Sequence, residues 1–347
     1  MKGAASAVRR RLKQEAEARL RLDQDAAAER AYRNYLYVRD RVRLMGRMAG
    51  QPRDLTGAEQ RMVTELAHLW DASPDTIARL RETSQVITGV AASDYVSPSA
   101  DLIARLKREV GRVRRLAGDE CFVEESALLG GFGYVRNSSR FNEDTARYFN
   151  ALLALEDGGV LQRHRHATAP SAVWEVGGGW GGFAYQFKAL CPRVTYLISG
   201  VPETFLVSAV YLMTVFPTAR CRFYGETSPD DFWRNWAELD FLFAPEAVLA
   251  TLRPPRFDLM LDIMSFRRMT DERVRAHVRY AFASGCPFVY SLTGAGERDV
   301  SESVRRAIEP FYWPHEVPGR LESAATDGRP NVEVGYDHLV GWKRLRV

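Results

Sequence analysis

The chain has 347 residues, of which 46% are hydrophobic, so it is long enough to build a full apolar core and is not expected to be disordered. No run of about 18 apolar residues occurs, and no apolar stretch follows the basic residues of the N-terminus, so we expect neither a transmembrane helix nor a secretory signal. Four widely spaced cysteines without a C-x-x-C pair indicate free thiols in a reducing cytoplasm and no zinc site.

The net charge of +4 is concentrated at the start of the chain, where residues 1–50 carry 13 basic and 6 acidic side chains. An arginine-rich helix of this kind can bind nucleic acid or anionic lipid. Acidic residues are interleaved with the arginines, however, which favours a helix that faces solvent or a partner. One such helix with a thin apolar stripe cannot bury itself alone, so we expect residues 4–50 to dock or to form a homo-oligomer, or else to cover the core.

The first 120 residues are predicted to be helical. Residues 4–45 contain neither proline nor glycine, and three further helices have N-terminal start signals. These signals are Thr56 with Glu59, Ser73 with Pro74, and Ser97 with Pro98 or Ser99. We therefore divide the chain into a helical N-terminal segment, 1–120, that serves docking, oligomerisation or as a lid over substrate, and a second domain, 121–347.

A connecting region follows this segment. Residues 124–150 suit a loop that covers a site, followed by a helix that begins near Asn142. Within 163–171, His164 and His166 are two residues apart, a spacing that can chelate a metal on a strand. Because this stretch is basic and contains proline, we favour a solvated loop and predict no metal site.

From residue 172 onward, strands and helices alternate. Strands are expected at 172–176, 193–199, 220–225 or 239–243, 256–266 and 286–294, with helices at 203–216 and 270–284. Two more candidate strands, within 309–319 and 334–345, can form an antiparallel pair at the edge. This alternation predicts an α/β fold with a doubly wound, mainly parallel sheet.

The stretch EVGGGWGG, residues 175–182, has five glycines at the junction between the first strand and the following helix. Glycine there allows a turn through positive φ and leaves room for a ligand against the backbone. A helix N-terminus also binds polar or anionic groups. A glycine-rich motif alone is weak evidence, but strand, glycine turn, helix and strand together predict a cofactor-binding turn.

Three motifs resemble those of the Rossmann-like S-adenosylmethionine-dependent methyltransferases and, more narrowly, of the bacterial sugar O-methyltransferase family. They are WEVGGGWGGFA from residue 174, YLISGVPET from residue 196, with Tyr211-Leu212 and Phe216-Pro217 further on, and FDLMLDIMSFRRM from residue 257. The similarity covers about residues 120–345. It implies S-adenosylmethionine as cofactor and a sugar hydroxyl on a glycan, nucleotide sugar or glycosylated small molecule as acceptor.

The resemblance and the rule that ligands bind outside the carboxyl ends of parallel strands together assign the site residues. Cofactor contacts are expected from Glu175, Gly177, Gly178, Gly179, Gly181, Gly200, Val201, Pro202, Glu203, Phe243, Ala244, Pro245 and Ser265. The general base is expected to be Asp262, with His338 and His315 as the other candidates.

Two positions depart from the family pattern. The aspartate that would bind the cofactor's ribose is Gly200 here, and the acid of a Glu-Met pair is Arg268. Glu203, at the start of the next helix, either supplies the missing carboxylate or only caps its helix. Water is another substitute for the aspartate. Gly200 and Arg268 also leave open a non-catalytic relative that binds or assembles, with the helical N-terminus pairing with a partner. A nicotinamide-dependent oxidoreductase is the third alternative, but it requires an acid at the end of the second strand, which Ser199-Gly200 does not provide.

Overall fold

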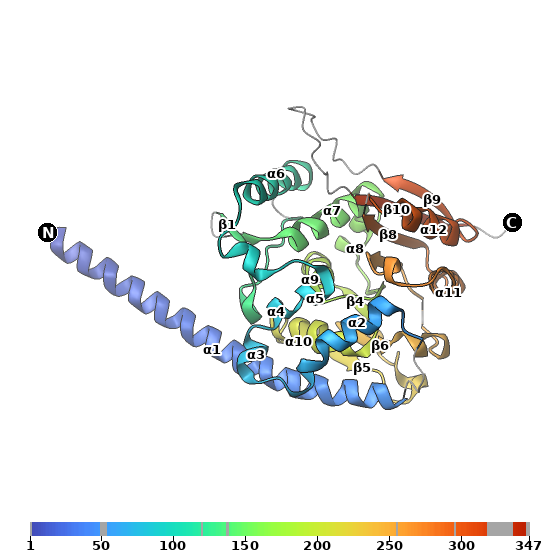
Figure 1. Cartoon of the computed structure of the whole chain (residues 1–347), viewed down its shortest axis with the longest axis horizontal. Helices are drawn as coiled ribbons and strands as arrows, with labels where there is room; N and C mark the ends of the chain where they lie inside the picture. The colour runs from blue at the N-terminus through green and yellow to red at the C-terminus, as the bar shows by residue number, and fades with distance from the viewer. Residues whose placement is uncertain are drawn as a thin grey trace.

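The structure is a computed structural model that describes residues 2–48, 54–118, 121–136, 139–254, 256–294, 296–317 and 336–344, with side chains in the first helix described from residue 25 onward. A central sheet is covered by helices on both faces, and one long helix runs along the body and extends beyond it (Figure 1).

Eight of the strands in the described residues form one sheet, in the order β5-β6-β4-β3-β7-β8-β10-β9. Their bounds are β3 Ser171–Val176, β4 Val194–Gly200, β5 Cys221–Phe223, β6 Phe241–Pro245, β7 Leu259–Ile263, β8 Phe288–Gly294, β9 Tyr312–Val317 and β10 Tyr336–Lys343. The strands from β5 to β8 are parallel, and β10 is antiparallel to both of its neighbours. If β3, β4, β6, β7 and β8 are counted as strands 1 to 5, their order in the sheet is 3-2-1-4-5, as in a Rossmann sheet. This order confirms the predicted α/β fold.

The helices begin largely where the sequence predicts. Their bounds are α1 Lys2–Met48, α2 Gly57–Leu66, α3 Pro74–Ala78, α4 Leu80–Thr83, α5 Gln85–Thr88, α6 Ala100–Ala117, α7 Glu143–Asp157, α8 Leu161–Arg165, α9 Gly182–Leu190, α10 Phe205–Val215, α11 Asp271–Ala283 and α12 Arg298–Ile308. Thr56 and Glu59 form the predicted capping box, and the side chains of Ser73, Asn142 and Thr270 cap α3, α7 and α11.

Several elements differ from the prediction. The helix expected after Ser73 is broken into α3, α4 and α5, and both candidates for the third strand, β5 and β6, join the sheet. A short hairpin, β1 Tyr134–Arg136 with β2 Ser139–Phe141, lies in the predicted loop, and α12 was not predicted. His164 is buried against Ser171, 3.0 Å from its hydroxyl, rather than solvated, and burial lowers its pKa to about 4. The described residues contain no group of three or more His, Cys, Asp or Glu side chains placed to hold a metal ion.

The second half of α1 is part of the core. Residues at three- and four-residue spacing from Ala27 to Met45 are buried where the helix packs against α10 and α3. Tyr35 fixes this contact, because its hydroxyl donates to Leu69 O at 2.8 Å and accepts from Ala72 N at 3.0 Å. The first half of α1 projects away from the body (Figure 1). The C-terminal half of the segment therefore covers the core, while docking or self-association of its N-terminal half remains a proposal.

The N-terminal helices and the sheet share one apolar core. A single cluster of buried side chains runs from Ala31 on α1, through Met62 and Ile87, to Val340 on β10. The domain boundary at residue 120 is not tested by this packing and stays a prediction. No described helix combines the length and apolar character needed to cross a membrane.

Candidate functional site

The glycine turn after β3 has the backbone conformation that requires glycine. Gly177, Gly179 and Gly181 have positive φ of 68°, 53° and 87°. A Cβ on Gly177 would lie 2.6 Å from the Oγ of Ser265, whose hydroxyl donates to Gly177 O at 2.9 Å. We expected a ligand to occupy the space beside Gly177, and the structure places Ser265 there instead. This glycine therefore packs the turn against the segment after β7.

The first turn of α9 leaves its backbone donors available. Gly181 is the N-cap residue, and no side chain caps the helix. An uncapped helix N-terminus presents free N–H groups and the positive end of the helix dipole. The turn and the helix together can hold a polar or anionic group, as the sequence predicted.

Glu175 lies beside this turn as a buried carboxyl group, 2% exposed, near the end of β3. It accepts a hydrogen bond from the hydroxyl of Tyr196 at 2.9 Å. Burial, with a smaller contribution from the nearby Asp262, raises the pKa of Glu175 to about 8. It forms no ion pair with any described residue. Glu175 is therefore mainly protonated at neutral pH, and a bound cation would favour its ionised form.

A small cavity of about 50 Å³ lies between the glycine turn and the helical segment. Its walls are Ile87 and Thr88 at α5, Arg147 and Tyr148 on α7, Glu175, Gly177, Gly178, Gly179, Phe183, and the segment Ile263, Met264, Ser265, Arg267 and Arg268 after β7. Sites for drug-sized ligands have volumes of about 300–1,000 Å³. In this conformation the cavity has room for a small polar group but not for a nucleoside.

The helical segment closes the cavity through α5. Ile87 Cγ2 would lie 3.5 Å from a Cβ placed on Gly179, and the guanidinium of Arg268 donates to the Ile87 carbonyl. The hydroxyl of Thr88 donates to Asp144 on α7 at 3.0 Å. We call the segment from α2 to α5, residues 57–88, the cap.

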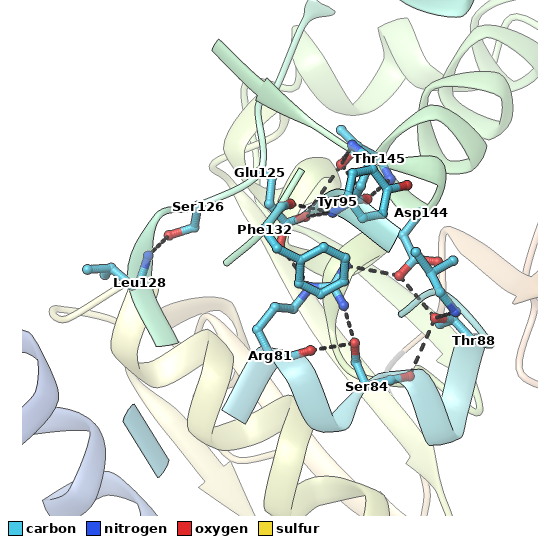
Figure 2. A network of polar contacts seen from close by, with 12 residues as sticks. Arg81, Ser84, Thr88, Tyr95, Glu125, Ser126, Leu128, Phe132, Asp144 and Thr145 are labelled. Carbon is cyan, nitrogen blue, oxygen red and sulfur yellow. Dashed lines mark hydrogen bonds and ion pairs between the residues drawn. The ribbon is translucent and has the colours of Figure 1, made fainter. Parts of the chain in front are cut away.

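A second set of contacts fixes the cap at α4 (Figure 2). Arg81 is fully buried and donates to Glu125 at 2.8 Å and to Asp144 at 3.0 Å, while its guanidinium lies over the Trp180 ring at 3.7 Å. Burial lowers the pKa of Arg81, but the charges of Glu125 and Asp144 outweigh this effect and raise the pKa above its ordinary value. Burial raises the pKa of Glu125. Since Trp180 belongs to the glycine turn, this network joins the cap to the site. No sequence pattern indicated this network.

Asp262 does not have the free carboxylate expected of a general base. Its Oδ1 accepts from the backbone N–H groups of Ser265 at 2.7 Å and Phe266 at 2.9 Å, and its Oδ2 accepts from the hydroxyl of Ser291 at 2.6 Å. Burial raises its pKa to about 6. Asp262 does not line the cavity. The structure therefore gives it a structural role, holding the turn that presents Ser265.

The two histidines are not brought to the glycine turn. His338 is buried on β10, 2.8 Å from the hydroxyl of Tyr290, and burial together with the charge of Arg112 lowers its pKa to about 4. His315 is exposed on β9, the edge strand. β8 separates β10 from β7, so neither histidine is placed as a base at this cavity.

The residues predicted to bind the rest of the cofactor meet at one edge of the sheet. Gly200 pairs with Pro245 in the register of β4 and β6, and a Cβ on Gly200 would lie 3.4 Å from Gly177 Cα. Val201, Pro202 and Glu203 follow, the last two in a 3₁₀ turn, η5 Pro202–Thr204, that packs against α1 and α2. They are buried, as are Phe243 and Ala244 on β6, and none of these residues lines the cavity.

Among known proteins, similarity to this chain was found only in solved structures. No protein-family model matches the chain, and no curated protein does. Solved structures that resemble it include a methyltransferase from Pyrococcus furiosus (10% identity over 70% of this chain and 100% of that one, TM-score 0.38). Others are the precorrin-6y C5,15-methyltransferase from Geobacter metallireducens (11%, 54% and 89%, TM-score 0.34) and protein 1320 of Thermoplasma acidophilum (15%, 57% and 89%, TM-score 0.33). Because these TM-scores are below 0.5, they carry no argument about activity, and the Rossmann-like fold of this chain rests on its own strand order.

Proposed function

We propose that this protein is a methyltransferase that uses S-adenosylmethionine. The observation that carries the proposal is Glu175, a buried carboxyl group without a cationic partner beside a glycine turn and an uncapped helix N-terminus. A ligand with an ammonium group fits this set of residues, because the ammonium can pair with the ionised carboxyl group. S-adenosylmethionine carries such a group at its methionine end.

The residues at the cavity fit the methionine end of this cofactor, whereas the residues expected at its nucleoside end are buried. In this proposal Glu175 and the free N–H groups at the start of α9 hold the methionine end, since the N–H groups of Gly177, Gly179 and Gly181 already donate to backbone carbonyls. The nucleoside would bind at the edge where Gly200, Pro202 and Pro245 lie. Since the cavity measures about 50 Å³, the cap must move before a nucleoside can enter. When bound, the cofactor's sulfonium supplies an already reactive methyl group. The contribution of this chain is to bind and orient it and to exclude water.

The finer proposal is that the acceptor is a sugar hydroxyl. It is supported by the three motifs that resemble the sugar O-methyltransferases. The proton of that hydroxyl needs an acceptor, and Asp262 is occupied by its own turn, so the base has to come from the acceptor side of the opened site or from solvent.

A second candidate, a non-catalytic relative, is favoured by the size of the cavity and by the absence of a free base among the described residues that line it. The oxidoreductase is disfavoured because β4 ends in Gly200 without an acid, and because β10 runs antiparallel in a sheet that would otherwise match the dinucleotide-binding order.

Calorimetry with S-adenosylmethionine, S-adenosylhomocysteine and NAD tests these alternatives. We expect the wild type to bind the first two and not NAD, and Glu175→Gln to weaken binding by roughly tenfold, since a charge-assisted hydrogen bond is lost. Glu238→Gln, which removes an exposed carboxylate paired with Arg220 away from the cavity, is the control and should bind like the wild type. A wild type that binds neither S-adenosyl compound contradicts the proposal and leaves the non-catalytic relative. Transfer of labelled methyl to sugar acceptors then tests the finer proposal.

A further inference from the structure

Two ionisable side chains that form no ion pair with any described residue line the same cavity. One is Glu175, at the base of the glycine turn, and the other is Arg268, in the 3₁₀ turn η9 Phe266–Arg268 that follows β7. The sequence drew attention to Arg268 only as a departure from the family's acid, and gave it no role in the site.

Arg268 differs from the other two arginines that line the cavity. Arg147 pairs with Asp144 at 2.9 Å, and Arg267 pairs with Glu297 at 3.0 Å. Arg268 contacts neutral groups only, the Ile87 carbonyl and the Sδ of Met62 at 3.3 Å, and it forms no ion pair with any described residue. Burial, and then the charge of Arg267, lowers the pKa of Arg268. An anion in the cavity would therefore find a guanidinium that no carboxylate already holds.

We infer that the cavity binds the zwitterionic end of an α-amino acid, with Glu175 accepting its ammonium group and Arg268 binding its carboxylate. This inference rests on the proposed function, because it identifies the cavity as the subsite for the methionine end of the cofactor. The size of the cavity agrees, since about 50 Å³ has room for the small polar end of such a ligand and not for its nucleoside. Guanidinium and carboxylate are also well matched, because they can form two parallel hydrogen bonds.

The same residue connects this subsite to the cap. In the structure Arg268 donates to the carbonyl of Ile87, and its own carbonyl accepts from the hydroxyl of Thr56 at 2.8 Å. When a ligand carboxylate accepts the hydrogen bonds of the Arg268 guanidinium, the hydrogen bond from Arg268 to the Ile87 carbonyl is lost. The side chain of Ile87, which lies over Gly179, is then free to move. Binding of the amino-acid end thus loosens α5 at the place where the cavity must widen.

The test compares two ligands that share a nucleoside and differ in the amino-acid end. S-adenosylhomocysteine carries the ammonium and carboxylate, and 5′-methylthioadenosine carries neither. We expect Arg268→Gln to weaken S-adenosylhomocysteine by about tenfold or more, since a charged pair is lost. Binding of 5′-methylthioadenosine should not be weakened, because this variant removes only the contact that holds Ile87 over the cavity. Arg268→Lys keeps the charge but not the forked geometry and should fall between the two.

Arg267→Gln is the comparison variant, because Arg267 lines the same cavity but is already paired, and a smaller loss is expected from it. Binding of 5′-methylthioadenosine also reports that the variant is folded and that its nucleoside site is intact. Equal weakening of both ligands in Arg268→Gln, or none, overturns the inference while the proposed function stands. A wild type that binds no S-adenosylhomocysteine overturns the proposed function, and this inference with it.

Discussion

Replacing Glu175 with glutamine tests whether the site holds an uncharged carboxyl group at neutral pH, as its burial implies. Glutamine has nearly the same shape and can still accept the hydrogen bond from Tyr196, so the packing of β3 is retained. What the substitution removes is the proton that the wild-type side chain holds in the folded state.

The magnitude follows from the two pKa values. The pKa of Glu175 is about 8 in the folded protein, against an ordinary value of 4.5. A carboxyl group with a raised pKa stabilises the fold fully below pH 4.5, and this contribution is lost as the pH rises through 8. Each pH unit in which only the folded state holds the proton changes the free energy of unfolding by about 1.4 kcal/mol. Between pH 7 and pH 8, where the group is partly ionised, the loss is about 1 kcal/mol.

Urea denaturation at pH 7 and pH 8 measures this loss. The free energy of unfolding of the wild type should fall by about 1 kcal/mol more than that of Glu175→Gln, whereas Glu297→Gln should follow the wild type. This interval is suitable because Asp262 and His338, with pKa values of about 6 and 4, contribute chiefly at lower pH. Equal pH dependence in the wild type and Glu175→Gln would refute the reasoning, since Glu175 would then already be ionised.

Three further predictions concern the surroundings of the site. Glu203→Gln should weaken S-adenosylhomocysteine by roughly tenfold if Glu203 replaces the missing ribose carboxylate. Gly200→Asp should fold, because the added Cβ would lie at an ordinary contact distance of 3.4 Å from Gly177 Cα. In calorimetry it should bind S-adenosylhomocysteine more tightly than the wild type. Undiminished binding by Glu203→Gln, together with no gain from Gly200→Asp, contradicts this placement of Glu203. Arg81→Met should lower the free energy of unfolding by about 3–5 kcal/mol, because two buried carboxylates lose their partner, and a loss below 1 kcal/mol in urea melts would show that the network is unimportant. A chain that begins at residue 25 should keep the folded core. If the projecting half of α1 pairs with a second copy, light scattering should find fewer chains per particle than in the full-length protein. An unchanged number of chains per particle rules that role out.

The fold was predictable because its signals are local. The capping residues Thr56, Asn142 and Thr270 each act on backbone groups within three residues, so the helix starts could be found without knowledge of the tertiary structure. Alternation of strands and helices likewise predicted the sheet. The prediction of a single helix after Ser73 was wrong: the segment forms three short helices, of which α3 contacts α1 and α4 contacts α10, and no local pattern encodes these contacts.

The site was predictable only where it is made by one stretch of chain. Glu175, the glycine turn and Ser265 could be selected as candidates because they lie at the ends of strands, and the structure brings them together at one cavity. Asp262 was given the wrong role because sequence position shows that a carboxylate lies at a strand end, but not that its own turn already occupies it. Ile87 and Arg268 were missed as partners because 181 residues separate them, and only the folded cap brings them together.

Among the contacts that hold the cap, those of Arg81 at α4 and of Arg268 at α5 differ in kind, and this difference predicts which part of the cap opens. Arg81 holds α4 through buried carboxylates and the Trp180 ring, so its release would leave unpaired charges away from water. Arg268 holds Ile87 of α5 through its neutral carbonyl, so release of this contact leaves only a carbonyl to be solvated, and the other polar contact of α5 is the single hydrogen bond from Thr88 to Asp144. We therefore expect amide hydrogen exchange to be faster at the end of α5, where Gly89 N donates to Gln85 O, than at the amides of α9 beneath Trp180. S-adenosylhomocysteine should alter exchange in α5 and leave that of α4 nearly unchanged. Simultaneous exchange of α4 and α5 at one rate would instead mean that the cap opens as a unit and that Arg268 is not the point of release.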